Sequence, residues 1–195
     1  TKKLINIYGI AAGMKYLHSN GILHRNLTAS SILEDENYHP KITNFHNIQQ
    51  CKDFSKNNDG HLINSKYVSP EVVEDYKYSK SSDVFSFAII LYEIITNEIP
   101  FSEFQNDLDI RKAIWEGYRP EFNKHIPQCY QNLIELCWSD DPSKRPTFHE
   151  IVDLLKNNQE FVTEEVDQNE FKKYIKIIDD HIKPVNEIIS IQQKN

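Results

Sequence analysis

The segment 84–95 constrains the fold of this chain more than any other part of its sequence. Its residues are apolar almost all round, so a helix built from it has no polar face to turn toward water. Such a helix must be enclosed by other elements of the same fold. A chain of 195 residues can bury roughly 70% of the surface that it exposes when unfolded. We therefore expect this segment to be the central helix of one domain or of one large lobe.

Other helices are indicated by apolar residues at helical spacing. In the segment 4–19 these residues form one stripe, and Gly21 after it is a typical helix stop. Further helices are predicted over 107–116, 128–138 and 147–157. Short β-like runs at 22–23, 31–33 and 41–43 lie among polar turns, and the polar segment 53–60 predicts a mobile loop. The fold is therefore predicted to be mainly α, with a few short strands near its start.

The last part of the chain, 159–195, differs in character from the rest. It is acidic at first and then carries apolar residues at helical spacing from Phe171 to Ile182. Pro184 is expected to end or kink that helix. The apolar stripe either packs on its own lobe, which is the interpretation we favour, or binds a partner.

Composition excludes several classes of function. A formal net charge of −7 argues against nucleic-acid binding. No apolar run approaches the length of a membrane span and the first residues lack a signal-peptide pattern, so we expect no membrane association. The three cysteines form no metal spacing and no even disulfide set, which favours a reducing, cytoplasmic location. Because the chain begins with Thr1 and its only methionine is Met14, we expect it to be a piece of something longer.

Five short motifs follow one another along the chain. They are HRNLTASSIL at 24–33, NFH at 44–46, SPE at 69–71, DVFSFA at 83–88, and LCW with DPSKRPT between 136 and 147. In this order they resemble the catalytic loop (H-R-D-L-x-x-x-N), the D-F-G and A-P-E triplets, the large buried helix and the D-P-x-x-R-P signature of protein kinases. The resemblance covers residues 1–158, as a kinase-like large (C-terminal) lobe, and leaves 159–195 as a tail. LCW and the YVSPE at 67–71 resemble the tyrosine-kinase-like Ser/Thr branch.

The resemblance implies structural roles for residues that match the family. Arg145 would pair with Glu71 and so hold the activation segment on the helices beneath it. Asp83 would accept backbone hydrogen bonds from the catalytic loop. His24 and Phe45 would join the packed spine beneath that loop.

Arg25 has two interpretations. In active relatives the matching arginine often binds a phosphorylated activation loop, for which Ser55 or Ser65 would be the acceptor here. The alternative, which we favour, is that Arg25 only tethers the loop through backbone contacts.

The positions that carry the chemistry of the family hold other residues. Asn26 stands where the catalytic aspartate accepts a proton from the substrate hydroxyl, and losing a positioned base costs about 10²–10⁴-fold in rate. Thr28 replaces the lysine that neutralises the transferring phosphoryl group. Ser31 and Asn44 replace the two metal ligands, although Mg²⁺ prefers carboxylate oxygens. We therefore expect no intact catalytic residue and no metal site.

Two supporting positions differ as well. His46 replaces the glycine of D-F-G, and Asn64 falls where Ser/Thr kinases place a threonine that contacts the catalytic residues. The sequence also shows no Gly-rich loop, no V-A-I-K-like lysine and no partner glutamate helix, which in kinases precede the helix that begins near Leu4. We expect the small lobe to be missing and the chain as given to bind no cofactor.

Two functions from different classes remain open. The first, which we favour, is a catalytically inactive pseudokinase that acts as a protein-interaction or regulatory module in signalling, with a protein partner and without nucleic acid or membrane. It would present the groove near the activation segment, the helix at 107–116 and the tail. The second is an active Ser/Thr protein kinase whose small lobe is absent from this piece, and only this second function requires ATP and Mg²⁺.

Overall fold

The computed structural model describes the backbone of residues 1–44, 49–50, 65–123 and 125–192. Side chains are described for the same residues except 49–50 and 182–192. The predicted loop at 53–60 and the predicted site residues Phe45, His46, Ser55 and Asn64 therefore lie outside the described residues.

Helix α3 (Lys80–Thr96) is the central helix that the sequence predicts. It begins at a capping box, in which Ser79 Oγ accepts the N–H of Ser82 at 3.2 Å and Ser82 Oγ accepts the N–H of Ser79 at 2.9 Å. It ends at Asn97, which has a left-handed φ of 58°. Every side chain from Val84 to Tyr92 is buried, so a helix enclosed on all sides is confirmed there.

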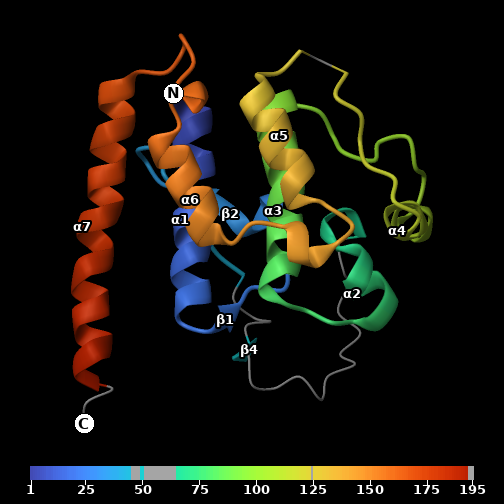
Figure 1. Ribbon diagram of the computed structural model, residues 1–195, viewed down its shortest axis with the longest axis horizontal. Helices are drawn as coiled ribbons and strands as arrows, with labels where there is room; N and C mark the ends of the chain where they lie inside the picture. The colour runs from blue at the N-terminus through green and yellow to red at the C-terminus, as the bar shows by residue number, and fades with distance from the viewer. Residues whose placement is uncertain (45–48, 51–64, 124, 193–195) are drawn as a thin grey trace.

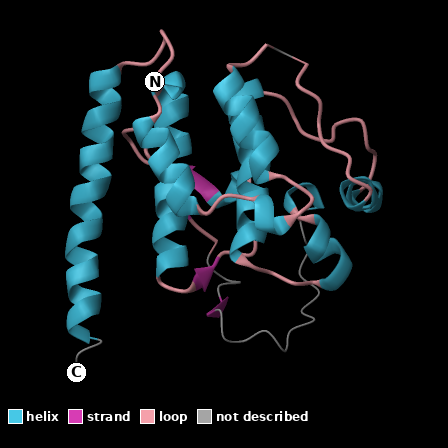
Figure 2. Ribbon diagram, viewed as in Figure 1, coloured by secondary structure: helices cyan, strands magenta, loops and turns pink. Residues whose placement is uncertain are grey.

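In the described part of the chain, six more helices surround or extend this core (Figures 1 and 2). α1 (Lys2–Ser19) contacts both α3 and α6 (Phe148–Asn157), and α5 (Gln128–Cys137) packs against α3. α4 (Asp107–Trp115) contacts α2 (Pro70–Asp75) and the 3₁₀ turn η3 (Ser65–Tyr67), at the edge of the molecule opposite α7 (Gln168–Gln192). The helices predicted over 4–19, 107–116, 128–138 and 147–157 are confirmed with ends shifted by at most two residues, whereas α3 begins four residues before the predicted segment 84–95.

The described strands form two small antiparallel ribbons (Figure 2). β1 (Ile22–Leu23) pairs with β4 (Gln49–Gln50), with Ile22 opposite Gln50. β2 (Ile32–Glu34) pairs with β3 (Pro40–Ile42), with Leu33 opposite Lys41. The predicted strand at 31–33 begins one residue later because Ser31 closes the 3₁₀ turn η1 (Ala29–Ser31). Gly21, before β1, has the positive φ of 71° that suits a helix stop.

Helix α7 lies along α1 (Figure 1). Phe171 and Tyr174 are buried and meet the ring of Tyr8 edge-on, at centroid distances of 5.4 and 6.3 Å. Gly9 makes this approach possible, because a Cβ there would lie 2.3 Å from Tyr174 Oη and 2.5 Å from Pro40 Cγ. The interpretation that the tail packs on its own lobe is confirmed for this part of α7.

One expectation from the sequence was wrong in part, and one helix was missed. The helix does not end at Pro184, since α7 continues to Gln192; a proline removes one backbone hydrogen bond, and that loss does not interrupt this helix of 25 residues. Helix α2 was not expected, because its six residues are too few to show a period of 3.6. Its start at Ser69 and Pro70 follows the usual preference for proline in the first turn.

In the described part of the chain, no helix has the combination of length and apolarity that crossing a membrane requires.

Candidate functional site

Asp83, in the first turn of α3, holds the start of the catalytic-loop segment. Its buried carboxylate accepts the backbone N–H of His24 and of Arg25, each at 2.9 Å. It also accepts a hydrogen bond from Nε2 of His18 at 2.9 Å. Three donors therefore satisfy one buried carboxylate, which fixes the segment 24–25 on the central helix.

His18 is a site residue that the sequence analysis missed. It lies in the last turn of α1, is buried, and packs edge-on against the ring of Phe148 at a centroid distance of 5.1 Å. A signal was present, because His18 follows Ala11 and Met14 at helical spacing on the buried stripe. A histidine on such a stripe requires a polar partner, and the partner is Asp83.

His24 connects the catalytic-loop segment to the end of β3. Its Nδ1 accepts the N–H of Asn26 at 3.3 Å, so the proton is assigned to Nε2, which donates to the carbonyl of Thr43 at 3.0 Å. Burial lowers the pKa of His24 below its ordinary value of 6.5. A buried neutral imidazole thus spans the two segments that carry Asn26 and Asn44.

Arg25 is held in a left-handed conformation, with a φ of 65°. Its backbone N–H binds Asp83, and its guanidinium lies 5.5 Å from the ring centroid of Tyr78. Of the two acceptors considered for phosphorylation, Ser65 is fully buried and Ser55 lies outside the described residues. The structure shows a backbone tether at Arg25, and the choice between the two interpretations stays a prediction.

Two of the four substituted positions bind each other. The hydroxyl of Ser31 donates to the carbonyl of Thr28 at 2.7 Å and accepts the N–H of Thr28 at 2.9 Å. Both residues are buried, and Thr28 Oγ1 lies 2.9 Å from Ser30 Oγ. These hydroxyls complete the η1 turn and do not point into an open site.

The other two substituted positions are more accessible. Asn26 is half-buried in the segment that follows Arg25. Asn44 is exposed and has a φ of 63°, a conformation that asparagine tolerates better than most residues. Neither side chain carries a charge.

Residues 26, 28, 31 and 44 do not fit the Mg²⁺ that the resemblance implies. They provide two amides and two hydroxyls, and the Ser31 hydroxyl is buried against its own turn. Mg²⁺ requires a near-octahedral set of hard oxygens, commonly with one or two carboxylates. Elsewhere, the described residues contain no group of three or more His, Cys, Asp or Glu side chains placed to hold a metal ion.

Glu71 and Arg145 join the end of the activation segment to the segment that precedes α6. Nη1 and Nη2 of Arg145 donate to the two carboxylate oxygens of Glu71 at 2.7 and 2.9 Å. The Arg145 side chain is 0% exposed and that of Glu71 is 20% exposed. Arg145 also donates to the carbonyls of Ser139 at 2.8 Å and Ser81 at 3.0 Å, so the guanidinium is bonded on every side.

A second buried contact, between Tyr67 and Glu93, was not expected from the sequence. The Tyr67 hydroxyl donates to the Glu93 carboxylate, with oxygen distances of 2.9 and 3.0 Å. Burial raises the pKa of both groups. The backbone carbonyl of Tyr67 accepts a hydrogen bond from Ser86 at 2.7 Å. Turn η3 is thereby attached to α3 at two points.

Comparison with known proteins identifies the family. A model for protein tyrosine and serine/threonine kinases matches residues 1–155. A probable LIM domain-containing serine/threonine-protein kinase of Dictyostelium discoideum is 37% identical over 157 residues, which are 79% of this chain and 23% of that protein. Serine/threonine-protein kinase 12 of Arabidopsis thaliana is 37% identical over 159 residues, which are 76% of this chain and 34% of that protein.

Dual specificity protein kinase pyk3 of D. discoideum is 37% identical over 150 residues, which are 77% of this chain and 11% of that protein. The chain thus spans about a third or less of the length of each of these relatives. Together with the central α3, the Asp83 contacts and the Glu71–Arg145 pair, the match of the family model over most of the chain shows that this chain belongs to the protein kinase family and has the fold of its large lobe.

Proposed function

We propose that this chain is a pseudokinase lobe, a kinase-like module that acts in signalling by binding protein partners and transfers no phosphoryl group. The observation that carries the proposal is the state of Ser31. Its hydroxyl lies where the family places a magnesium ligand, yet it is fully buried and bonded to both backbone groups of Thr28. Mg²⁺ keeps several waters when it binds proteins, and this buried turn leaves no place for them.

The absence of charge at the other substituted positions supports the same function. Phosphoryl transfer relies on positioned charge, from a base, a lysine and the bound metal ions. Asn26, Thr28 and Asn44 provide none of it. When only one of these positions is changed, the remaining catalytic residues can compensate for its loss. Here the base, the lysine and both metal ligands are replaced together.

A protein partner is part of the proposal, as is a cytoplasmic location without cofactor, nucleic acid or membrane. Large exposed side chains on α4 support a partner. Leu108 and Trp115 are 68% and 55% exposed and lie seven residues apart, on one face of the helix. Side chains of this size are typical of protein interfaces.

The relatives favour a second function, an active Ser/Thr protein kinase. Their names describe serine/threonine or dual-specificity kinases. This function requires ATP and Mg²⁺, together with a small lobe from sequence that precedes residue 1. Nucleotide binding therefore separates the two functions.

The first test is a thermal-shift titration with ATP, with and without Mg²⁺, on the protein extended upstream to include any small lobe. A ligand at about 100 times its Kd stabilises the folded state by roughly 2.7 kcal/mol. We expect no Mg²⁺-dependent shift. A shift that requires Mg²⁺ would mean that a metal site forms despite Ser31 and Asn44, and it would contradict the proposal.

The second test measures phosphorylation of a generic protein substrate by the same extended protein. We expect activity only after combined restoration of the family residues by Asn26→Asp, Thr28→Lys, Ser31→Asn and Asn44→Asp. The matched control replaces the small-lobe lysine alone. If the unaltered protein phosphorylates the substrate and this control does not, the second function is correct.

A further inference from the structure

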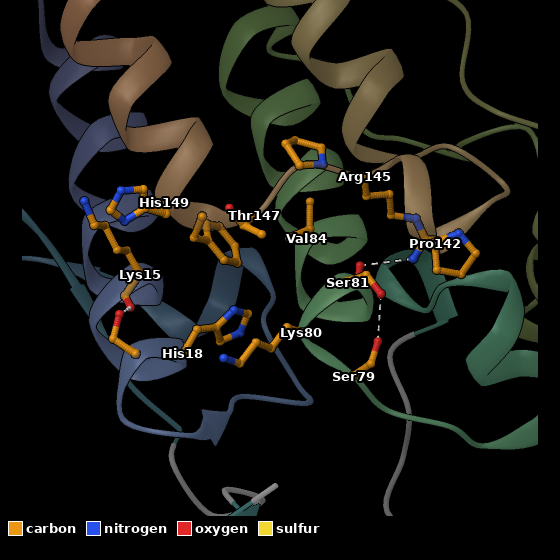
Figure 3. A pocket seen from close by; sticks show the side chains of 13 residues that line it. Lys15, His18, Ser79, Lys80, Ser81, Val84, Pro142, Arg145, Thr147 and His149 are labelled. Carbon is orange, nitrogen blue, oxygen red and sulfur yellow. Dashed lines mark hydrogen bonds between the residues drawn. The ribbon is translucent and has the colours of Figure 1, made fainter.

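A cavity of about 490 Å³ opens between three elements of the lobe, away from the four substituted positions (Figure 3). The end of α1, the start of α3 and the segment that leads into α6 form its walls. In Figure 3, Lys15 and His149 lie at one side of the cavity and Ser81 and Arg145 at the other, with Lys80 between them. Its volume lies in the range of small-molecule sites, about 300–1,000 Å³.

The lining of this cavity carries positive charge without acidic residues. Lys15, Lys80 and Arg145 line it, and none of the lining residues, all of which the structure describes, is Asp or Glu. The Arg145 charge is balanced by Glu71, at 2.7 Å. Positive charge from the two lysines therefore faces the cavity.

No described residue supplies Lys80 with a counter-charge. Lys80 is exposed at the first position of α3 and forms no hydrogen bond or ion pair with another described residue. Lys15 has a distant one, since its Nζ lies 3.8 Å from Asp153, and His149 Nε2 lies 3.3 Å from the same carboxylate. The Asp153 carboxylate, which lies outside the lining, is thus shared by Lys15 and His149. The Lys80 ammonium group is therefore available to bind an anion.

Hydrogen-bond donors accompany these charges. The hydroxyl-bearing residues Ser79 and Thr147 line the cavity and are the N-caps of α3 and α6. Their hydroxyls are already bonded, since each accepts the N–H of the third residue of its helix at 3.2 Å and that of Thr147 donates to the Glu150 carboxylate at 2.8 Å. The N–H groups of the first two residues of each helix have no partner within the helix, and those residues also line the cavity.

The remaining wall is apolar. Pro142 and Pro146 line it with partly exposed rings, above Val84 and Phe148, which are each 1% exposed. A bare inorganic anion would leave this wall uncovered, whereas an anion attached to an organic group would cover it. We propose that this cavity binds a phosphomonoester, with its phosphate near Lys80 and Lys15 and its organic part on the apolar wall.

The proposal does not depend on whether the chain transfers phosphate, because neither Asn26 nor Asn44 lines the cavity. Two sources supply this chemistry: a phosphorylated side chain of a protein partner and a phosphorylated small molecule. The experiment distinguishes them with separate probes.

The experiment titrates the whole 195-residue chain with phenyl phosphate at constant ionic strength. Binding is followed by calorimetry and by NMR of lysines carrying ¹³C-methyl groups, assigned with the variants. We expect the Lys15 and Lys80 signals to shift and Lys80→Gln to weaken binding about three- to tenfold. The matched control is Lys112→Gln on α4, whose lysine is 69% exposed and is absent from the cavity lining; it should leave the Kd unchanged.

Three outcomes would overturn the proposal. The first is equal binding by the unaltered protein and by Lys80→Gln. The second is the same lysine shifts in sodium chloride of equal ionic strength, and the third is inorganic phosphate that binds as tightly as phenyl phosphate. A phosphoserine peptide and glycerol 3-phosphate then identify the source, since the tighter of the two indicates a protein or a small-molecule ligand. If neither exceeds inorganic phosphate, the proposal fails.

Discussion

Two regions of this lobe differ in how their polar groups are hydrogen-bonded. The first, which we call the frame, consists of Asp83 and the Glu71–Arg145 pair. Its groups are charged, deeply placed, and bonded to donors or acceptors from distant parts of the chain. The second consists of positions 26, 28, 31 and 44, where the side chains are neutral and the two hydroxyls bind their own turn.

This difference separates the requirements of folding from those of catalysis. Removing one partner from a buried ion pair costs about 3–5 kcal/mol, because the other charge stays buried without compensation. Folding alone therefore accounts for the presence of the frame. A neutral residue in the catalytic loop has no comparable cost to the fold. The frame indicates the kinase fold, and under the proposed function the four positions are the ones that decide on phosphoryl transfer.

The largest expected effect comes from Glu71→Gln. This change leaves the fully buried Arg145 guanidinium without its carboxylate. We expect the free energy of unfolding in urea to fall by about 3 kcal/mol. Lys77→Gln is the control, because the Lys77 and Asp75 side chains are 74% and 48% exposed, and it should cause no measurable change. Equal effects of the two changes would contradict the role of the frame.

Asp83→Asn should have the next largest effect. Whichever carboxylate oxygen becomes an amide nitrogen, at least one of the donors from His18, His24 and Arg25 then faces another donor. We expect a loss of about 2 kcal/mol in the free energy of unfolding. Hydrogen exchange at the backbone N–H groups of His24 and Arg25 should become faster. Unchanged exchange at both amides would show that Asp83 does not hold the loop.

A pair of glycines tests whether the packing of the tail on α1 contributes to the stability of the fold, as the frame does. At Gly9 an added methyl group meets Tyr174 Oη and the rigid Pro40 ring, and at Gly13 it meets only the end of the Ile42 side chain. We expect Gly9→Ala to destabilise the fold by about 1–2 kcal/mol. Gly13→Ala should be close to neutral, because the better helix propensity of alanine offsets a side-chain shift. Equal melting temperatures for the two variants would mean that α7 does not depend on this contact.

Ser31→Ala tests the second region, which consists of positions 26, 28, 31 and 44. The change removes a hydroxyl that bonds to both the N–H and the carbonyl of Thr28. We expect a loss of about 1 kcal/mol in the free energy of unfolding, and no change in the response to ATP and Mg²⁺. A response to Mg²⁺ in the unaltered protein that disappears in this variant would instead assign Ser31 to a metal site.

The sequence predicts the helical core well because each long helix has a clear period or a long apolar run. The apolar segment 84–95 and the stripe at 4–19 correspond to α3 and α1. The sequence motifs also place Asp83, Glu71 and Arg145 in the frame, although only by resemblance. These parts of the fold depend on local pattern or on family spacing.

Other contacts could not be predicted, because they depend on which elements meet in space. The hydrogen bond from His18 to Asp83 joins residues 65 positions apart, and that from Tyr67 to Glu93 joins residues 26 apart. The internal bonding of Ser31 depends on the η1 turn, which is too short to show a period. The basic lining of the cavity combines residues from three segments, none of which carries a charge run of its own.

The smallest expected effect concerns His24, which stands at the junction of the two regions. Burial lowers its pKa below 6.5, so between the folded-state pKa and 6.5 the unfolded chain binds more protons than the folded protein. The free energy of unfolding should therefore decrease as the pH falls through that window, and it should reach its full value above pH 6.5. NMR titration of the His24 ring should give a midpoint below 6.5, and His24→Gln should reduce the loss of stability on acidification. A midpoint at or above 6.5 would mean that burial does not disfavour the charged imidazole, which would form between Thr43 and Asn26 as readily as in the unfolded chain. The N–H of Asn26 would then lose its acceptor at Nδ1, and a neutral His24 ring would not connect the frame to the catalytic-loop segment.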